Sequence, residues 1–159
     1  MSDPFDPGAH RMRPSRWFED FAPGERYVLP SRTMTVADFA AFRVVSGDNH
    51  PIHYDRPFCK ALGLPGLFAH GLQVLCFTAA GAGLFPHETT ESLVAFLDQS
   101  SKFLRPAVEN DTLYPALEIT DCAPQQTTGV ITMGATIHNQ RGELVLEGQQ
   151  RYLVRKRPA

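Results

Sequence analysis

VSGDNHPIH, residues 45–53, is the stretch of this 159-residue sequence that says most about its fold and its function. It places the carboxylate of Asp48 and the imidazole of His53 in a segment interrupted by Gly47 and Pro51. A spacing of five residues does not put two side chains on one face of a helix, so a bent loop must bring them together. Two titratable groups placed in this way favour a functional site over a solvated turn. We interpret Asp48 and His53 as an acid/base pair.

The residues before this loop predict a strand followed by a short helix. Residues 26–32 have the composition of a first strand. Thr35 followed three residues later by Asp38 is typical of a capping box, in which an acidic side chain closes the start of a helix. Apolar residues then recur at helical spacing until Gly47, which is typical of a helix end. The helix is therefore expected to deliver Asp48 at its C-terminal exit.

Length and composition indicate one soluble globular domain. Hydrophobic residues make up 43% of the chain and charged residues 20%, and the net charge of -2 offers no basic field to nucleic acid or to an anionic membrane. No apolar run reaches membrane-spanning length, and the N-terminus lacks the apolar region of a signal peptide. Residues 1–15 are expected to form a flexible arm and residues 16–159 one domain. An odd number of cysteines without paired spacing supports neither a disulfide framework nor a structural zinc site, so we expect a reduced, cytoplasmic compartment; these are Cys59, Cys76 and Cys122.

The segment after the loop predicts a buried helix. Residues 68–84 are almost wholly apolar and show no polar face. A helix of this composition is expected to be buried on all sides. It is too short and too rich in glycine for a membrane span.

From residue 93 onward the pattern changes to the alternation of β-strands. A hairpin turn is expected at residues 139–142, and Pro115 predicts a bulge or an edge position in its strand. The expected strands lie at residues 93–104 (broken around 99–101), 113–119, 131–137 and 143–154. The sum is an α+β protein in which one antiparallel sheet wraps around a single apolar helix.

At the loop, the chain resembles the MaoC-like dehydratases, also called (R)-specific enoyl-CoA hydratases or hydratase 2. Residues 46–53 follow the signature of that family except at His50, where the family usually has asparagine. Ala-His-Gly at residues 69–71 matches a second family element, and residues 103–108 look like the first long strand after the helix. The resemblance covers residues 17–155. It implies a single hotdog fold, in which the sheet wraps around a long central helix.

The resemblance also implies roles for individual residues. Asp48 and His53 would together hold a water molecule and transfer protons to and from a 2-enoyl thioester. Gly71 would donate its backbone N–H to the thioester oxygen. His70 would brace the loop beside the substrate. Thr78 stands near the position of a family serine at the acyl site, and could replace its hydroxyl if it faces inward.

The loop-shaping residues and the partners follow from the same resemblance. The residues that would shape the loop are Gly47, His50 and Pro51. No cofactor and no metal ion are required for the reaction. The expected partners are an acyl thioester of coenzyme A or of acyl carrier protein, and further copies of the chain in a homodimer or a larger assembly of dimers.

Metal binding and nucleophilic catalysis are two other chemistries that residues of this region could support. His50, His53 and Asp55 are close enough in sequence to coordinate zinc, although their spacing matches no zinc motif. Cys59 could act as a nucleophile beside a histidine, although nothing in the sequence orients that base. Asp48 could also simply cap a turn.

Two rival functions stay open beside hydration. A hotdog acyl-CoA thioesterase would favour a carboxylate on the central helix, and residues 71–84 contain neither aspartate nor glutamate. A non-catalytic module that binds acyl thioesters would tolerate His50 and the missing serine.

Overall fold

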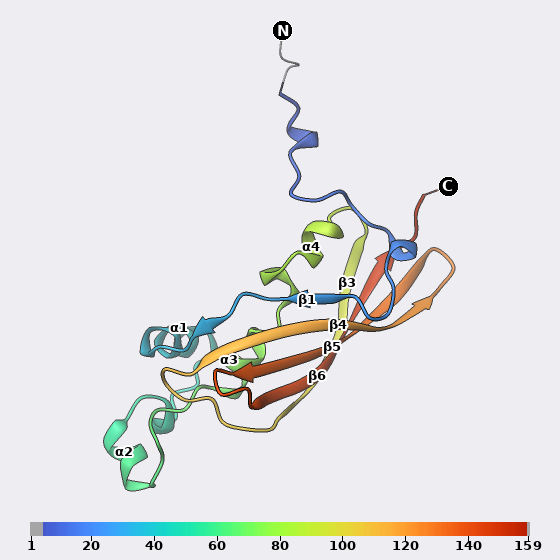
Figure 1. Ribbon diagram of the computed structural model, residues 1–159. Helices are drawn as coiled ribbons and strands as arrows, with labels where there is room; N and C mark the ends of the chain where they lie inside the picture. The colour runs from blue at the N-terminus through green and yellow to red at the C-terminus, as the bar shows by residue number, and fades with distance from the viewer. Residues whose placement is uncertain (1–4, 159) are drawn as a thin grey trace.

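A computed structural model describes residues 5–158 of the chain, and its strands form one antiparallel sheet (Figure 1). The strand order is β1-β4-β5-β6-β3, and β2 also pairs with β4. The strands are β1 (Arg26–Val28), β2 (Arg32–Thr33), β3 (Leu93–Phe103), β4 (Thr112–Pro124), β5 (Thr128–Asn139) and β6 (Leu144–Arg155). The expected antiparallel sheet is confirmed, and β3 lies at one of its edges.

The hairpin between β5 and β6 shows how the local sequence sets the pairing. Gly142 adopts a φ of 74°, and the N–H of Asn139 donates to the carbonyl of Glu143 at 3.0 Å. This turn fixes a register in which Met133 lies opposite Gln150. Alternate side chains of β5 therefore face the core, namely those of Ile131, Met133, Ala135 and Ile137. The expected hairpin at residues 139–142 is confirmed.

The expected break in β3 and the expected bulge at Pro115 were wrong. β3 is continuous through residues 99–101, and its irregularities lie earlier, between Leu93 and Asp98. Pro115 pairs regularly with Ile137, and the bulge of β4 lies between Ile119 and Asp121. Proline is accommodated because it lies opposite the interruption between β1 and β2, where fewer ladder hydrogen bonds are needed.

Helix α1 (Val36–Ser46) begins and ends as its sequence predicts. The N–H of Thr35 donates to Asp38 Oδ2 at 2.8 Å, and the N–H of Asp38 donates to Thr35 Oγ1 at 3.4 Å. Gly47 has a φ of 72°, a left-handed conformation that glycine adopts without steric cost. The chain therefore leaves α1 directly at Asp48.

The expectation of one long helix buried on all sides was wrong. The segment forms α3 (Gly71–Cys76), the 3-10 turn η4 (Ala80–Ala82) and α4 (Phe85–Glu88). Ala79 is extended, with a ψ of 115°, and Pro86 cannot continue a helix because its ring would meet the carbonyl four residues earlier. One face of α3 is open, since Leu72 is 64% exposed and Cys76 is also exposed. Apolar composition predicted contact with other chain segments, but not the length of the helix.

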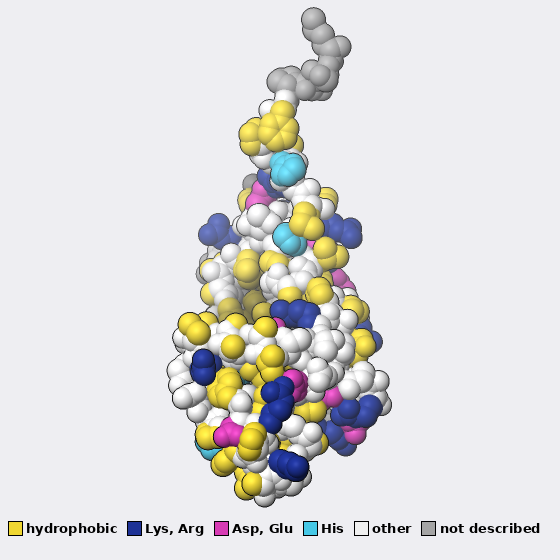
Figure 2. Space-filling model, turned by 90° about the vertical axis from the view of Figure 1, so that its left-hand side faces the viewer, with side chains coloured by type: hydrophobic (Ala, Val, Ile, Leu, Met, Phe, Trp, Pro, Cys, Tyr) yellow, Lys and Arg dark blue, Asp and Glu magenta, His cyan; other side chains and the backbone are white. Residues whose placement is uncertain are grey.

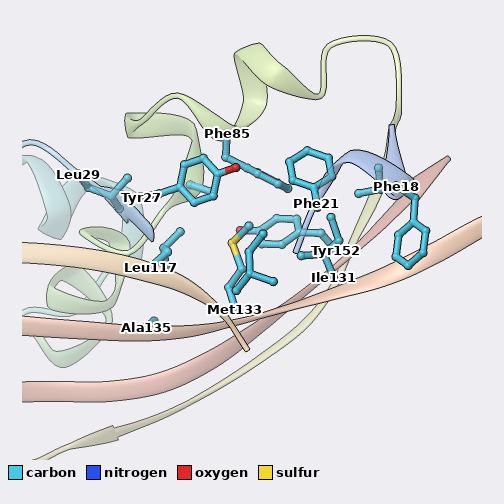
Figure 3. Close-up of a cluster of buried hydrophobic side chains, with 13 residues drawn as sticks. Phe18, Phe21, Tyr27, Leu29, Phe85, Leu117, Ile131, Met133, Ala135 and Tyr152 are labelled. Atoms are coloured by element: carbon cyan, nitrogen blue, oxygen red, sulfur yellow. The ribbon is translucent and has the colours of Figure 1, made fainter. Parts of the chain in front are cut away.

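Two buried clusters lie against the inner face of the sheet. The first surrounds Phe85, whose ring lies within 6 Å of the rings of Phe21, Tyr27 and Tyr152 (Figure 3). The second lies under α1 and α3; among its members are Met34, Phe39, Val74, Leu113, Ile137 and Leu146. This second cluster fixes the elements that carry the predicted loop.

The remaining elements place that loop at one end of the molecule. α1 and α2 (Arg56–Ala61) lie together at the end of the sheet opposite the chain termini (Figure 1). On that side, hydrophobic and basic side chains are interspersed (Figure 2). The short 3-10 helices are η1 (Pro7–Ala9), η2 (Phe18–Asp20) and η3 (Pro51–His53).

The flexible arm at residues 1–15 and the single domain at 16–159 stay predictions, and residues 1–4 and 159 lie outside the described residues. Among residues 5–158, no helix combines the length and the apolar character that a membrane crossing demands.

Candidate functional site

The loop after α1 is held by hydrogen bonds of its own backbone. The N–H of His50 donates to Asp48 Oδ1 at 3.2 Å, and the N–H of Ile52 donates to Nδ1 of His50 at 3.3 Å. Pro51 is the first residue of η3. Proline suits this position, because the backbone N–H of a first helical residue has no partner in the helix and the fixed φ of proline matches the turn. Together with Gly47, these residues form the bend that the spacing of Asp48 and His53 requires.

The loop brings Asp48 and His53 together. Nε2 of His53 lies 3.8 Å from Oδ2 of Asp48, a separation too long for a direct hydrogen bond. The Asp48 side chain is 50% exposed and that of His53 only 11%. Nδ1 of His53 lies 2.7 Å from the carbonyl oxygen of Phe68, and since a carbonyl only accepts, Nδ1 carries the proton. The lone pair of Nε2 is therefore directed toward the side of Asp48.

Burial sets the protonation of His53. It lowers the pKa of the imidazole below the usual 6.5, because the charged form loses hydration. The hydrogen bond to Phe68 and the charge of Asp48 oppose this shift, and the neighbouring His70 and His50 add to it. The net direction is downward. At neutral pH the ring is a neutral base with a free Nε2.

His70 is packed directly against His53. The two rings are stacked at 3.7 Å with an interplanar angle of 21°, and His70 is 2% exposed. Its Nε2 lies 2.8 Å from the hydroxyl of Tyr54, and its Nδ1 lies 3.2 Å from Oε1 of Gln73. These contacts fix the plane of His70, and the stacking in turn restricts the plane of His53.

The sequence interpretation missed Tyr54 and Gln73. The hydroxyl of Tyr54 also lies 3.2 Å from the carbonyl oxygen of Asp48, so it connects the loop with His70. Tyr54 belongs to no periodic pattern, and nothing in the sequence could have identified it. Gln73 carried a signal, because a polar residue inside the apolar segment needs a partner when it is buried.

Gly71 and Thr78 occupy opposite ends of α3. Gly71 is the first residue of the helix, beside His70, and a Cβ there would lie 3.6 Å from the ring of Phe103. Thr78 follows the helix and is 1% exposed. Its hydroxyl donates to the carbonyl of Leu75 at 2.8 Å and accepts from Nε2 of Gln150 at 2.7 Å. Thr78 thus faces inward, but the structure does not bring it to the Asp48 and His53 pair.

An apolar cavity of about 410 Å³ lies beyond α3, between the segment that contains η4 and the strands β3 and β6. Thr78 lies in its wall. Other lining residues are Leu75, Cys76, Ala79, Phe85, Leu93 and Phe96. A cavity lined in this way suits a hydrocarbon chain better than a polar group.

The alternative chemistries find little support in the geometry. Potential ligand atoms of Asp48, His53 and His70 lie within 4.8 Å of one another. The rings of His53 and His70 are stacked, however, so their nitrogen lone pairs lie in nearly parallel planes and do not converge on one metal ion. Asp55 instead caps α2 by accepting from the N–H of Phe58 at 2.9 Å. Cys59 is 1% exposed, and its thiol donates to the carbonyl of Ile52 at 3.3 Å.

Comparison with known proteins connects this geometry with one family. The model of the family described as "MaoC like domain" matches residues 20–140. An (R)-specific enoyl-CoA hydratase from Rhodospirillum rubrum is 24% identical over 138 residues, which cover 87% of this chain and 91% of that protein. Protein MaoC from Klebsiella aerogenes is 30% identical over 105 residues, covering 65% of this chain but only 30% of that longer protein.

Solved structures show the same fold. The X-ray structure of a monoamine oxidase regulatory protein from Archaeoglobus fulgius has a TM-score of 0.84 at 30% identity, over 93% of this chain and 99% of that one. A Mycobacterium tuberculosis protein with a double hotdog fold has a TM-score of 0.76 at 24% identity, over 91% of this chain and 45% of that one. The chain therefore has the hotdog fold, as the sequence predicts.

Proposed function

Because this chain belongs to the MaoC like domain family, we propose that it is an (R)-specific enoyl-CoA hydratase, which adds water reversibly to a trans-2-enoyl thioester. The observation that carries the proposal is the pairing of Asp48 with the free Nε2 of His53 at 3.8 Å. A water molecule between two such groups can lie within hydrogen-bond distance of both. The proposal takes its substrate class from the relative in Rhodospirillum rubrum.

The proposed reaction is a proton transfer coupled to addition of water. The water oxygen bonds to C3 of the substrate while one of its protons passes to the Asp48 and His53 pair. The electrons of the C2–C3 double bond move toward the thioester oxygen, and the pair delivers a proton to C2. We assign these transfers to the pair jointly, because two coupled groups do not titrate separately. His70 acts by holding the ring of His53 in place.

Gly71 is proposed to stabilise the thioester oxygen. It begins α3, and the first N–H groups of a helix have no partner within the helix. The absence of a side chain lets the substrate approach the backbone closely. The acyl tail would then extend along α3 toward the apolar cavity, where Thr78 is a wall residue and not an oxyanion donor. Coenzyme A is the proposed carrier, and the cytoplasm the proposed compartment.

The open edge of β3 supports a homodimer. β3 pairs only with β6 among the described strands, and an unpaired edge is a template for another strand. Leu97 on this edge is 43% exposed and Val94 45%. We therefore expect Leu97→Lys to convert a dimer into a monomer, as measured by light scattering after size exclusion. Val44→Lys, on an 83% exposed position of α1, is the matched control. A wild-type protein that elutes as a monomer would contradict this expectation.

Absorbance measurements on a panel of trans-2-enoyl-CoA thioesters test the proposed function directly. Hydration should remove the absorbance of the conjugated enoyl group without releasing a thiol. Release of free thiol, detected in parallel with a thiol reagent, would instead indicate a thioesterase. Silence in both measurements would favour a non-catalytic module.

We expect His53 to titrate below the usual histidine value. Because burial lowers the pKa of its ring, the neutral form should predominate at pH 7 and be lost only as the pH falls below about 6.5. Imidazole resonances followed by NMR as a function of pH measure this directly. His138, which is partly exposed on the sheet face away from the core, provides a reference resonance in the same sample. A midpoint for His53 above 6.5 would contradict the expectation.

A further inference from the structure

His50 contacts both halves of the proposed acid/base pair through its backbone. Its N–H donates to Oδ1 of Asp48 at 3.2 Å, and its carbonyl accepts from the N–H of His53 at 3.1 Å. A small movement of His50 would therefore change the separation between Asp48 and His53. Misplacement of a reacting group by about 1 Å can lower a rate by on the order of a hundredfold.

The side chain of His50 closes the turn that carries His53. Its Nδ1 accepts a hydrogen bond from the N–H of Ile52 at 3.3 Å, so His50 is the N-cap residue of η3. Nδ1 can accept only while it carries no proton. A protonated imidazole has two donors and no acceptor, so protonation of His50 replaces this hydrogen bond with two N–H groups that face each other. The bond exists only in the neutral form of His50.

The surroundings allow this protonation to occur. His50 is exposed to water. Among the described residues, the titratable groups against it are Asp48 and His53, whose ring lies 6.4 Å away, and α2 contributes the uncharged Phe58 at 5.9 Å. Histidine is the side chain that ordinarily changes its charge between about pH 5 and pH 8.

We propose that His50 is a positioning residue that makes the catalytic loop sensitive to pH, because its protonation opens η3 and disturbs the geometry of Asp48 and His53. The proposal rests on the proposed function for its effect on turnover. The proposed effect of His50 protonation on the structure of the loop is independent of that function.

The kinetic test compares His50→Asn with the wild type. Asparagine is a strong N-cap whose side-chain oxygen accepts a hydrogen bond at every pH. Because His50 itself helps to lower the pKa of His53, the midpoint of His53 is measured by NMR in both proteins, and the ratio of wild-type to variant kcat is corrected for any difference between the two midpoints. This ratio should fall about three- to tenfold between about pH 8 and about pH 5.5, the population change that corresponds to one ordinary hydrogen bond. The matched control is His138→Asn, for which the ratio should stay flat. A flat ratio for His50→Asn would overturn the proposal.

An NMR titration tests the loop without reference to activity. In the wild type, the amide resonance of Ile52 should shift with the same midpoint as the ring of His50, and its protection from hydrogen exchange should decrease in acid. In His50→Asn the Ile52 amide should no longer titrate with that midpoint. If no thioester is turned over, the proposed function fails, and this titration still decides the proposal. An Ile52 amide that does not follow His50 would overturn it.

Discussion

Replacing Asp48 by asparagine, or His53 by glutamine, is expected to lower kcat by about a hundred- to ten-thousand-fold, the usual cost of losing general acid/base catalysis. Asparagine keeps the shape of Asp48 but cannot accept a proton, and the half-exposed carboxylate contributes little to folding. Glutamine can fill the space of His53 but provides no base. Steady-state hydration of an enoyl-CoA substrate measures the loss. The double variant should be only slightly slower than the slower single variant, because residues that act as a unit are not additive.

Asp55→Asn is the matched control for these variants. Asp55 lies near the same loop, but it caps α2 through the N–H of Phe58 at 2.9 Å and takes no part in the pair. Asparagine caps a helix as well as aspartate does, so turnover should stay within about twofold of the wild type. If Asp48→Asn and His53→Gln both kept near-normal turnover, the assignment of the pair would be wrong. Circular dichroism of each variant separates a loss of chemistry from a loss of fold.

The sequence predicted those parts of the site that depend on local signals. The capping box at Thr35 and the left-handed Gly47 determine where α1 begins and ends, and hence where Asp48 emerges. Both signals act within a few residues of chain. The bend between Asp48 and His53 was predicted for the same reason, since glycine and proline restrict the backbone wherever they occur.

Other parts of the structure could not be predicted from local signals. The sequence could not show whether Thr78 faces inward, because its direction is set by Gln150, which lies 72 residues further along the chain. The break after α3 could not be predicted from apolar composition, because an apolar segment is expected to be buried whether or not it forms one continuous helix. Tyr54 gained its place through His70, on another element. The hydrogen bonds that fix Thr78 and Tyr54 are tertiary contacts, and no local pattern encodes them.

Phe85→Ala is expected to destabilise the protein by about 3–5 kcal/mol, the usual cost of removing a buried aromatic ring. Phe85 is 1% exposed, and its ring packs against Phe21, Tyr27 and Tyr152 (Figure 3). These neighbours come from the N-terminal segment, β1 and β6, so one truncation leaves a cavity among elements that cannot all move inward together. Urea unfolding followed by circular dichroism measures the change in the free energy of unfolding.

Two controls show whether the loss arises from the cavity. Phe85→Leu keeps part of the volume and should cost clearly less than Phe85→Ala. Leu62→Ala, at the 58% exposed residue that follows α2, should change the free energy of unfolding by no more than about 0.5 kcal/mol. All variants must be compared at one protein concentration, because assembly of a dimer adds to the apparent stability. A loss below about 1 kcal/mol for Phe85→Ala would mean that α4 is not anchored by this cluster. The cavity beyond α3, which Phe85 also lines, would then lack its fixed wall.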